Sequence, residues 1–271
     1  MKMKQNDLAS LPEKYRHFAE DISSFIPSTR IFADPIRRVA YGVDASLYRI
    51  TPKLVVKVRT SDEVALIIKS AAKYNIALTF RTAGTSLSGQ ALSDSVLLLL
   101  AGGWSKYKIE DNGETIKLEP GILGSEANVY LKPYARKIGP DPASINHAMI
   151  GGIAANNASG MCCGTTDNSY KTIADMKLIL ADGSMLDTAD RVSRDYFIAK
   201  HPDLIGEIGR IRDEINSDAT LRELILHKYK IKNTTGYGMN SFVDYHDPID
   251  IIKHLMIGSE GTLGFIAEVT Y

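Results

Sequence analysis

The chain has 271 residues, of which 44% are hydrophobic, so it can bury a sizeable core as one domain of two lobes. Its 32 lysines and arginines balance 32 aspartates and glutamates, which gives no reason to expect nucleic acid as a partner. The chain lacks an apolar run of about 18 residues, the length of a membrane span, and its first residues lack the apolar core of a signal peptide. We therefore expect no transmembrane segment. The chain has only two cysteines, which are neighbours, so we also expect a cytoplasmic protein, and a peripheral position at a membrane stays open for the full-length protein.

Residues 1–45 are expected to form a helical lead-in to the main domain. Apolar side chains recur at helical spacing between residues 7 and 26, and Pro27 is expected to end this helix. The residues that carry the spacing are Leu8, Leu11, Tyr15, Phe18, Ile22 and Phe25.

The first lobe is expected over about residues 46–105. A strand at 54–58 is followed by a helix from Ser61 to Asn75, which Ser61 is expected to cap. A short buried strand at 77–81 and another strand at 95–100 then enclose a loop. The strand–helix–strand unit leads directly into this loop.

The loop over residues 81–90 has the composition of an anion site. It contains glycines and hydroxyl side chains but no carboxylate, so several backbone N–H groups can converge on one phosphate or pyrophosphate. The spacing from Gly84 to Gly89 fits half of a Walker A loop, but Gln90 stands where that motif requires lysine. A P-loop NTPase is therefore not expected. Arg81 either assists in neutralising phosphate or pairs within the fold, and the sequence leaves both roles open.

The second lobe is expected over about residues 106–271. Strands at 106–110 and 115–119 are joined by a tight turn, a helix follows around 125–137, and a strand hairpin covers 176–187. The charged stretch 189–232 has a helical pattern and is predicted to be an insertion. A last strand is expected at 265–271.

Two further glycine-rich stretches lie in this lobe. The first covers residues 139–160, where Gly151 and Gly152 let the backbone approach a ligand without a Cβ in the way. Small residues there offer a surface for a flat group, and Asn156 supplies both donors and acceptors. The second stretch covers residues 257–266.

Several other residues in these stretches have two interpretations. His147 can approach a ligand, although a residue at the start of a helix is the favoured interpretation. Glu260 either acts as a base or, as we expect, braces its turn by accepting backbone N–H bonds. Cys162 and Cys163 are neighbours that do not easily form a disulfide and, without other ligands, hold neither zinc nor an iron–sulfur cluster. We expect them to pack as small apolar residues near the ligand, in a chain without a metal site of its own.

The three stretches, in this order, resemble the FAD-linked oxidases whose cofactor domain is shared with p-cresol methylhydroxylase and vanillyl-alcohol oxidase. The resemblance extends from about Thr51 to the last residue. Residues 84–89, 150–156 and 258–264 are similar to the branch that contains D-lactate, glycolate and D-2-hydroxyglutarate dehydrogenases.

The sequences of residues 235–240 and 247–250 are most similar to those of the large bacterial members, which carry a flavin part fused to an iron–sulfur part. Thr82 and Ala83 depart from the family pattern, because many relatives have glycines there. Gly84 and the hydroxyls that suit a phosphate are retained.

The resemblance implies an α+β fold, a two-lobed FAD-binding domain of the p-cresol methylhydroxylase type, with FAD extended between the lobes. It places the pyrophosphate at 82–90, the ribityl and isoalloxazine parts along 140–143 and 150–160, and a strand from 258–266 beside the cofactor. No histidine lies in 81–90, so non-covalent FAD is expected. The cofactor-binding residues are predicted to be Arg81, Thr82, Ala83, Gly84, Thr85, Ser86, Gln90, Pro140, Asp141, Pro142, Ala143, Ile150, Gly151, Gly152, Ala155, Asn156, Ala158, Gly160, Gly164, Glu260, Gly264 and Ile266.

The resemblance further implies the FAD-binding portion of a dehydrogenase that oxidises a small-molecule D-2-hydroxy acid, of the D-lactate or D-2-hydroxyglutarate class, to the 2-oxo acid. In the family the catalytic residues come largely from a cap domain that follows the FAD domain. That domain is expected to be absent from these residues, which would then be an inactive fragment. A stand-alone flavin-binding or electron-transfer subunit is the alternative. An enzyme reducing a nucleotide-sugar enol ether fits residues 258–264 less well. The substrate and the electron acceptor, quinone or protein, stay open.

Overall fold

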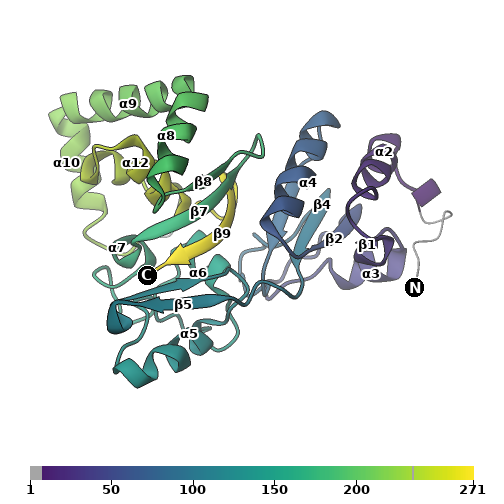
Figure 1. The fold of residues 1–271 in the computed structure, drawn as a ribbon, viewed down its shortest axis with the longest axis horizontal. Coiled ribbons are helices and arrows are strands. Elements are labelled where there is room, and N and C mark those ends of the chain that lie inside the picture. Colours follow the sequence, from purple (N-terminus) through teal and green to yellow (C-terminus); the bar gives the residue numbers. More distant parts are fainter. Residues whose placement is uncertain (1–7, 234) are drawn as a thin grey trace.

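The structure is a computed structural model that describes residues 8–233 and 235–271. It contains two β-sheets, each covered by helices, and the two lobes lie side by side along the longest axis of the molecule (Figure 1). The first sheet has the order β1-β2-β4-β3 and consists of β1 (Ile31–Phe32), β2 (Leu54–Val58), β3 (Leu78–Arg81) and β4 (Val96–Leu100). The second has the order β5-β6-β9-β7-β8 and consists of β5 (Tyr107–Glu110), β6 (Thr115–Leu118), β7 (Asp175–Leu180), β8 (Met185–Asp187) and β9 (Gly264–Thr270).

The predicted strand–helix–strand unit of the first lobe is confirmed. Strand β2 leads through helix α4 (Ser61–Lys73) to β3, and both strands pair in parallel with β4. The helix is capped by Thr60, whose Oγ1 accepts a hydrogen bond from the Glu63 amide at 3.2 Å, so the predicted cap at Ser61 is wrong by one residue. Strand β3 is only partly buried, since it forms one edge of this sheet.

The lead-in helix is shorter than its apolar spacing predicts. Helix α2 (Glu13–Ile22) begins after Pro12, which cannot donate a backbone hydrogen bond within a helix, and it ends before Pro27. The start of the predicted helix, Asp7, lies outside the described residues. Phe18 and Ile22 are fully buried in the core of the first lobe. Two short elements, η1 (Ser28–Arg30) and α3 (Pro35–Ala40), complete this part, and β1 joins the first sheet antiparallel to β2.

In the second sheet, both predicted hairpins are confirmed, β5 with β6 across η2 (Asp111–Gly113) and β7 with β8. The predicted last strand, β9, lies in the centre of the sheet, antiparallel to β6 on one side and to β7 on the other. Phe265 on β9 packs 5.1 Å from the Phe80 ring and 5.4 Å from the Trp104 ring, whereas Val269 belongs to the core of the second lobe. Strand β9 thus contributes side chains to the cores of both lobes, and the two lobes meet along this strand.

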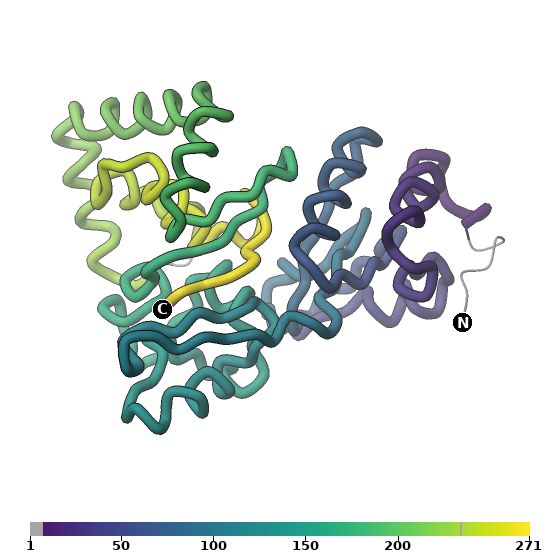
Figure 2. Tube along the Cα trace, in the orientation of Figure 1, coloured from purple at the N-terminus to yellow at the C-terminus, as the bar shows by residue number. Residues whose placement is uncertain are grey.

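The helix expected around 125–137 is α5 (Gly124–Leu131). The short η3 (Lys132–Tyr134), which contains Pro133, follows it directly. The stretch 189–232 is mostly helical, as its pattern indicates, and its helices, within residues 191–228, lie at the far end of the second lobe (Figure 2). That it is an insertion stays a prediction. Within the described parts of the chain, no helix has both the length and the apolar character needed to cross a bilayer. The remaining helices are α6 (Ile150–Asn156), α7 (Ser169–Thr172), α8 (Arg191–Lys200), α9 (Pro202–Ser217), α10 (Ala219–Lys228), α11 (Ser241–Asp244) and α12 (Pro248–Met256).

Candidate functional site

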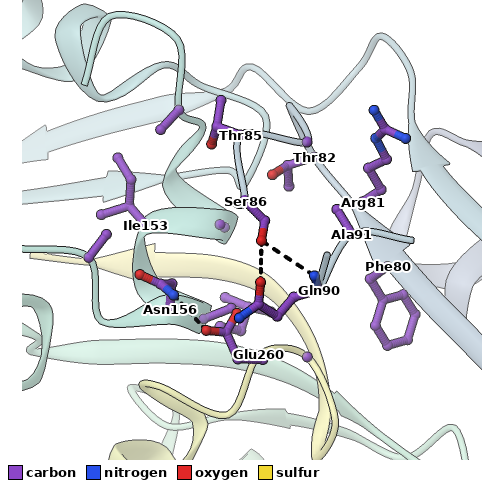
Figure 3. Close-up of a pocket in the computed structure, with 18 of the residues that line it drawn as sticks. Phe80, Arg81, Thr82, Thr85, Ser86, Gln90, Ala91, Ile153, Asn156 and Glu260 are labelled. Atoms are coloured by element: carbon purple, nitrogen blue, oxygen red, sulfur yellow. Dashed lines mark hydrogen bonds between the residues drawn. The ribbon is translucent and has the colours of Figure 1, made fainter. Parts of the chain in front are cut away.

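A cavity of about 370 Å³ lies where the lobes meet, and it brings the three glycine-rich stretches together (Figure 3). Its walls come from the end of β3 and the following loop, from α6, and from the turn that leads into β9. The predicted site residues that line it are Arg81, Thr82, Gly84, Thr85, Ser86, Gln90, Pro142, Gly151, Gly152, Ala155, Asn156, Ala158, Glu260, Gly264 and Ile266.

The other predicted site residues do not line this cavity: Ala83, Pro140, Asp141, Ala143, Ile150, Gly160 and Gly164. Ile150 is fully buried in the core of the second lobe, and Gly164 lies exposed in a turn. Gly160 has a packing role, because a Cβ added there would lie 1.6 Å from the carbonyl oxygen of Asp141. The backbone of the second stretch therefore folds tightly against itself beside the cavity.

Gly84 and Arg81 determine the shape of the loop after β3. Gly84 has a φ of +74°, and a Cβ there would lie 2.5 Å from Arg81 Nε. The guanidinium donates through Nη1 to the Tyr41 carbonyl oxygen at 3.0 Å and extends away from Ser86 and Glu260 (Figure 3). Burial lowers the pKa of Arg81, while the nearby Asp44 carboxylate counteracts this effect. Of the two roles left open by the sequence, the structure shows pairing within the fold.

The Ser86 hydroxyl is used inside the loop. It donates to Gln90 Oε1 and accepts a hydrogen bond from the Gln90 amide at 3.3 Å (Figure 3). It also accepts a hydrogen bond from the Ser88 amide at 3.2 Å. These contacts close the loop into a compact turn. Thr82 and Thr85 also line the cavity.

The adjacent glycines of α6 allow the helix to pack against its neighbours. A Cβ on Gly151 would lie 2.7 Å from Pro120 Cβ, and one on Gly152 would lie 2.9 Å from Thr82 Oγ1. The amide of Gly151 also donates to the Pro120 carbonyl oxygen at 3.0 Å. These glycines thus let α6 approach both the segment that follows β6 and the loop after β3, while their own backbone forms part of the cavity wall.

Glu260 departs from its expected role. Its side chain accepts a hydrogen bond from Asn156 Nδ2 at 2.5 Å, and within the described residues it accepts none from backbone amides. The turn is held by its main chain, because the Glu260 amide donates to the Ala155 carbonyl oxygen at 2.8 Å. Burial raises the pKa of the Glu260 carboxyl, and the Asn156 hydrogen bond partly offsets this effect.

Sequence reasoning missed two groups of cavity residues. Eight of these residues lie inside the three glycine-rich stretches but were not predicted individually: Leu87, Ser88, Ser144, Ala148, Ile153, Ser159, Gly261 and Phe265. Phe80 and Ala91 directly flank the first stretch. Leu100, Pro120 and Lys232 come from separate segments that only the fold brings near. Lys232 Nζ donates to the Ser159 carbonyl oxygen at 2.7 Å, and no local pattern indicates this contact.

His147 and the two neighbouring cysteines, Cys162 and Cys163, do not line this cavity. His147 is exposed in the turn that precedes α6. Cys163 is buried, but Cys162 is exposed, so the expectation that both pack as apolar residues is wrong for Cys162. Both cysteines line a different cavity, of about 430 Å³, together with Arg136 and Tyr271.

Comparison with solved structures supports the expected fold. Alkyldihydroxyacetonephosphate synthase superposes on 96% of this chain, and on 40% of its own length, with a TM-score of 0.63 at 19% identity. The BBE-like 1 protein of Physcomitrella patens superposes on 94% of this chain, and on 43% of its own length, with a TM-score of 0.57 at 14% identity. The α+β, two-lobed architecture of the p-cresol methylhydroxylase type is thereby confirmed.

The sequence is similar to curated bacterial proteins named as oxidoreductases. D-2-hydroxyglutarate dehydrogenase of Escherichia coli (strain K12) is 29% identical over 245 residues, which are 85% of this chain and 23% of that protein. The glycolate oxidase subunit GlcD of the same strain is 30% identical over 141 residues, which are 51% of this chain and 28% of that protein. The chain thus spans about a quarter of the length of these relatives.

The family profile for the FAD binding domain matches residues 52–189, which is half of the chain. This range contains the loop after β3 and the glycines of α6, the two elements that form most of the cavity wall. The chain therefore belongs to the FAD binding domain family, and FAD is its cofactor.

Proposed function

We propose that the chain is the FAD-binding part of a dehydrogenase that oxidises a D-2-hydroxy acid, of the D-lactate or D-2-hydroxyglutarate class, to the 2-oxo acid. The convergence of the three glycine-rich stretches on one cavity carries this proposal. Relatives named D-2-hydroxyglutarate dehydrogenase, and one from Arabidopsis thaliana named D-lactate dehydrogenase [cytochrome], 25% identical over 223 residues, support the substrate class.

The cavity suits the parts of FAD. Gly84 and Gly89 have φ values of +74° and +83°, so the loop between them can turn its amides toward a diphosphate. Thr82 and Thr85 add hydroxyl donors, and the loop itself carries no carboxylate that would repel phosphate. Within the described cavity wall there is no histidine, which supports non-covalent binding.

When bound, FAD supplies a hydride acceptor for the carbon that carries the substrate hydroxyl. The chain's own residues would hold this group in one orientation, which is a large part of what an enzyme contributes to such a reaction. Phe80, Leu100 and Phe265 give part of the wall an apolar surface. Gly151, Gly152 and Ala155 of α6 leave room for a flat ring to lie close to the backbone.

The proposal is tested by titrating the purified chain with FAD and with FMN, followed by identification of any flavin released on denaturation. We expect tighter binding of FAD, because the loop after β3 would contact a diphosphate that FMN lacks. Preferential binding of FMN would contradict the proposed cofactor arrangement. The substrate class is tested with the protein as encoded in its genome, using a dye acceptor and a panel of D-2-hydroxy acids. Turnover of other alcohols in preference to these acids would refute that part.

A further inference from the structure

Glu260 occupies a backbone conformation that disfavours its side chain. Its φ is +55°, between Gly258 at +85° and Gly261 at +76°. This region suits glycine or asparagine, and a non-glycine residue held there against its preference often has a functional role. The turn is fixed because the amides of Gly258 and Glu260 donate to the carbonyl oxygens of Ala154 and Ala155 at 3.3 and 2.8 Å.

The side chain of Glu260 is an acid without a cation. Oε1 accepts from Asn156 Nδ2, and Oε2 has no hydrogen-bond partner within the described residues (Figure 3). No ion pair to Glu260 occurs among those residues either. It is the one carboxylate in the described wall of the cavity, whose cations, Arg81 and Lys232, are bound to backbone carbonyls. Partial burial of the unpaired acid raises the pKa of its carboxyl.

An unpaired, half-buried carboxylate is unfavourable for the folded protein unless a ligand uses it. A phosphate cannot be that ligand, since the two anions repel each other. An ionised carboxylate has only acceptor sites, and its two oxygens suit neighbouring hydroxyl groups. FAD carries such hydroxyls in two places, on the adenosine ribose and on the ribityl chain.

We propose that Glu260, oriented by Asn156, accepts hydrogen bonds from hydroxyl groups of the sugar portion of FAD. The inference rests on the proposed function, because it assigns an additional contact in the same cavity. Asn156 is a positioning residue, since its amide holds Oε1 and leaves Oε2 free to face the ligand.

Isothermal titration of FAD, FMN and ADP into the parent, Glu260→Gln and Glu260→Asn tests the contact. Asparagine tolerates the positive φ but is too short to reach the same place, so this variant should fold like the parent with weaker FAD binding. We expect its FAD affinity to fall about tenfold or more, the usual range for a lost hydrogen bond to a charged group. Glu260→Gln keeps an acceptor and should lose less. Glu223→Gln, on the exposed face of α10, is the matched control for loss of charge.

A comparison of ADP with FMN distinguishes the two places in FAD that carry neighbouring hydroxyls, the adenosine ribose and the ribityl chain. Weaker binding of ADP with unchanged FMN assigns the contact to the adenosine ribose, and the reverse assigns it to the ribityl chain. The inference is overturned if both Glu260 variants bind all three ligands like the parent, if they bind FAD more tightly, or if Glu223→Gln weakens binding equally. If the parent binds FAD and the variants bind it equally well, only the Glu260 contact is refuted and the proposed function stands. If the parent itself binds no flavin, the proposed function is refuted.

Discussion

The substitution Gly84→Ala tests how the loop after β3 is held. Its φ of +74° costs a residue with a Cβ about 1–2 kcal/mol. The new Cβ would also lie 2.5, 2.6 and 2.8 Å from Arg81 Nε, Nη2 and Cζ, so the guanidinium must shift, and we expect this shift to break its hydrogen bond to the Tyr41 carbonyl oxygen. Loss of this hydrogen bond from a charged donor adds about 1.5–3 kcal/mol, for a total of about 2.5–5 kcal/mol of unfolding free energy.

Gly102→Ala is the matched control for this substitution. Gly102 also has a positive φ, +62°, but a Cβ there meets nothing within 4 Å, so only the cost of about 1–2 kcal/mol should remain. Urea unfolding measures both changes, and FAD titration measures their effect on the site. We expect Gly84→Ala to weaken FAD binding at least tenfold and Gly102→Ala to leave it unchanged. Equal losses of stability in the two variants, with FAD binding preserved in both, would refute this account of the loop.

Two further predictions concern stability. The His254 imidazole stacks on Tyr245 at 3.8 Å, and burial lowers its pKa from 6.5 to about 4. Between these values the unfolded chain binds a proton that the folded chain does not, so the unfolding free energy should fall by about 3 kcal/mol as the pH drops from 7 to 4. In urea titrations across this range His254→Gln should flatten that slope, and an unchanged slope would exclude His254 as its source. Gly160→Ala should lower the thermal midpoint by several degrees, because its Cβ would overlap the Asp141 carbonyl oxygen, and a midpoint like the parent's would show that the two segments can separate freely.

The sequence by itself predicted the elements whose signals are local. The unit of β2, α4 and β3, the two hairpins and the loop after β3 all follow from apolar periodicity and turn residues within short windows. Errors of this kind are small: the cap of α4 moves from Ser61 to Thr60, and α2 begins only after Pro12. The three glycine-rich stretches, through their resemblance to the family, also predicted most of the residues that line the cavity, because glycine-rich loops occur where the backbone approaches a ligand.

Tertiary structure alone decided the contacts between distant segments. It placed β9 in the centre of its sheet, tied Arg81 to Tyr41, and turned Glu260 toward Asn156. It also brought Lys232 to the cavity wall. Each of these contacts depends on which buried faces of distant segments pack together. A local sequence pattern does not identify the distant segment with which it will pack.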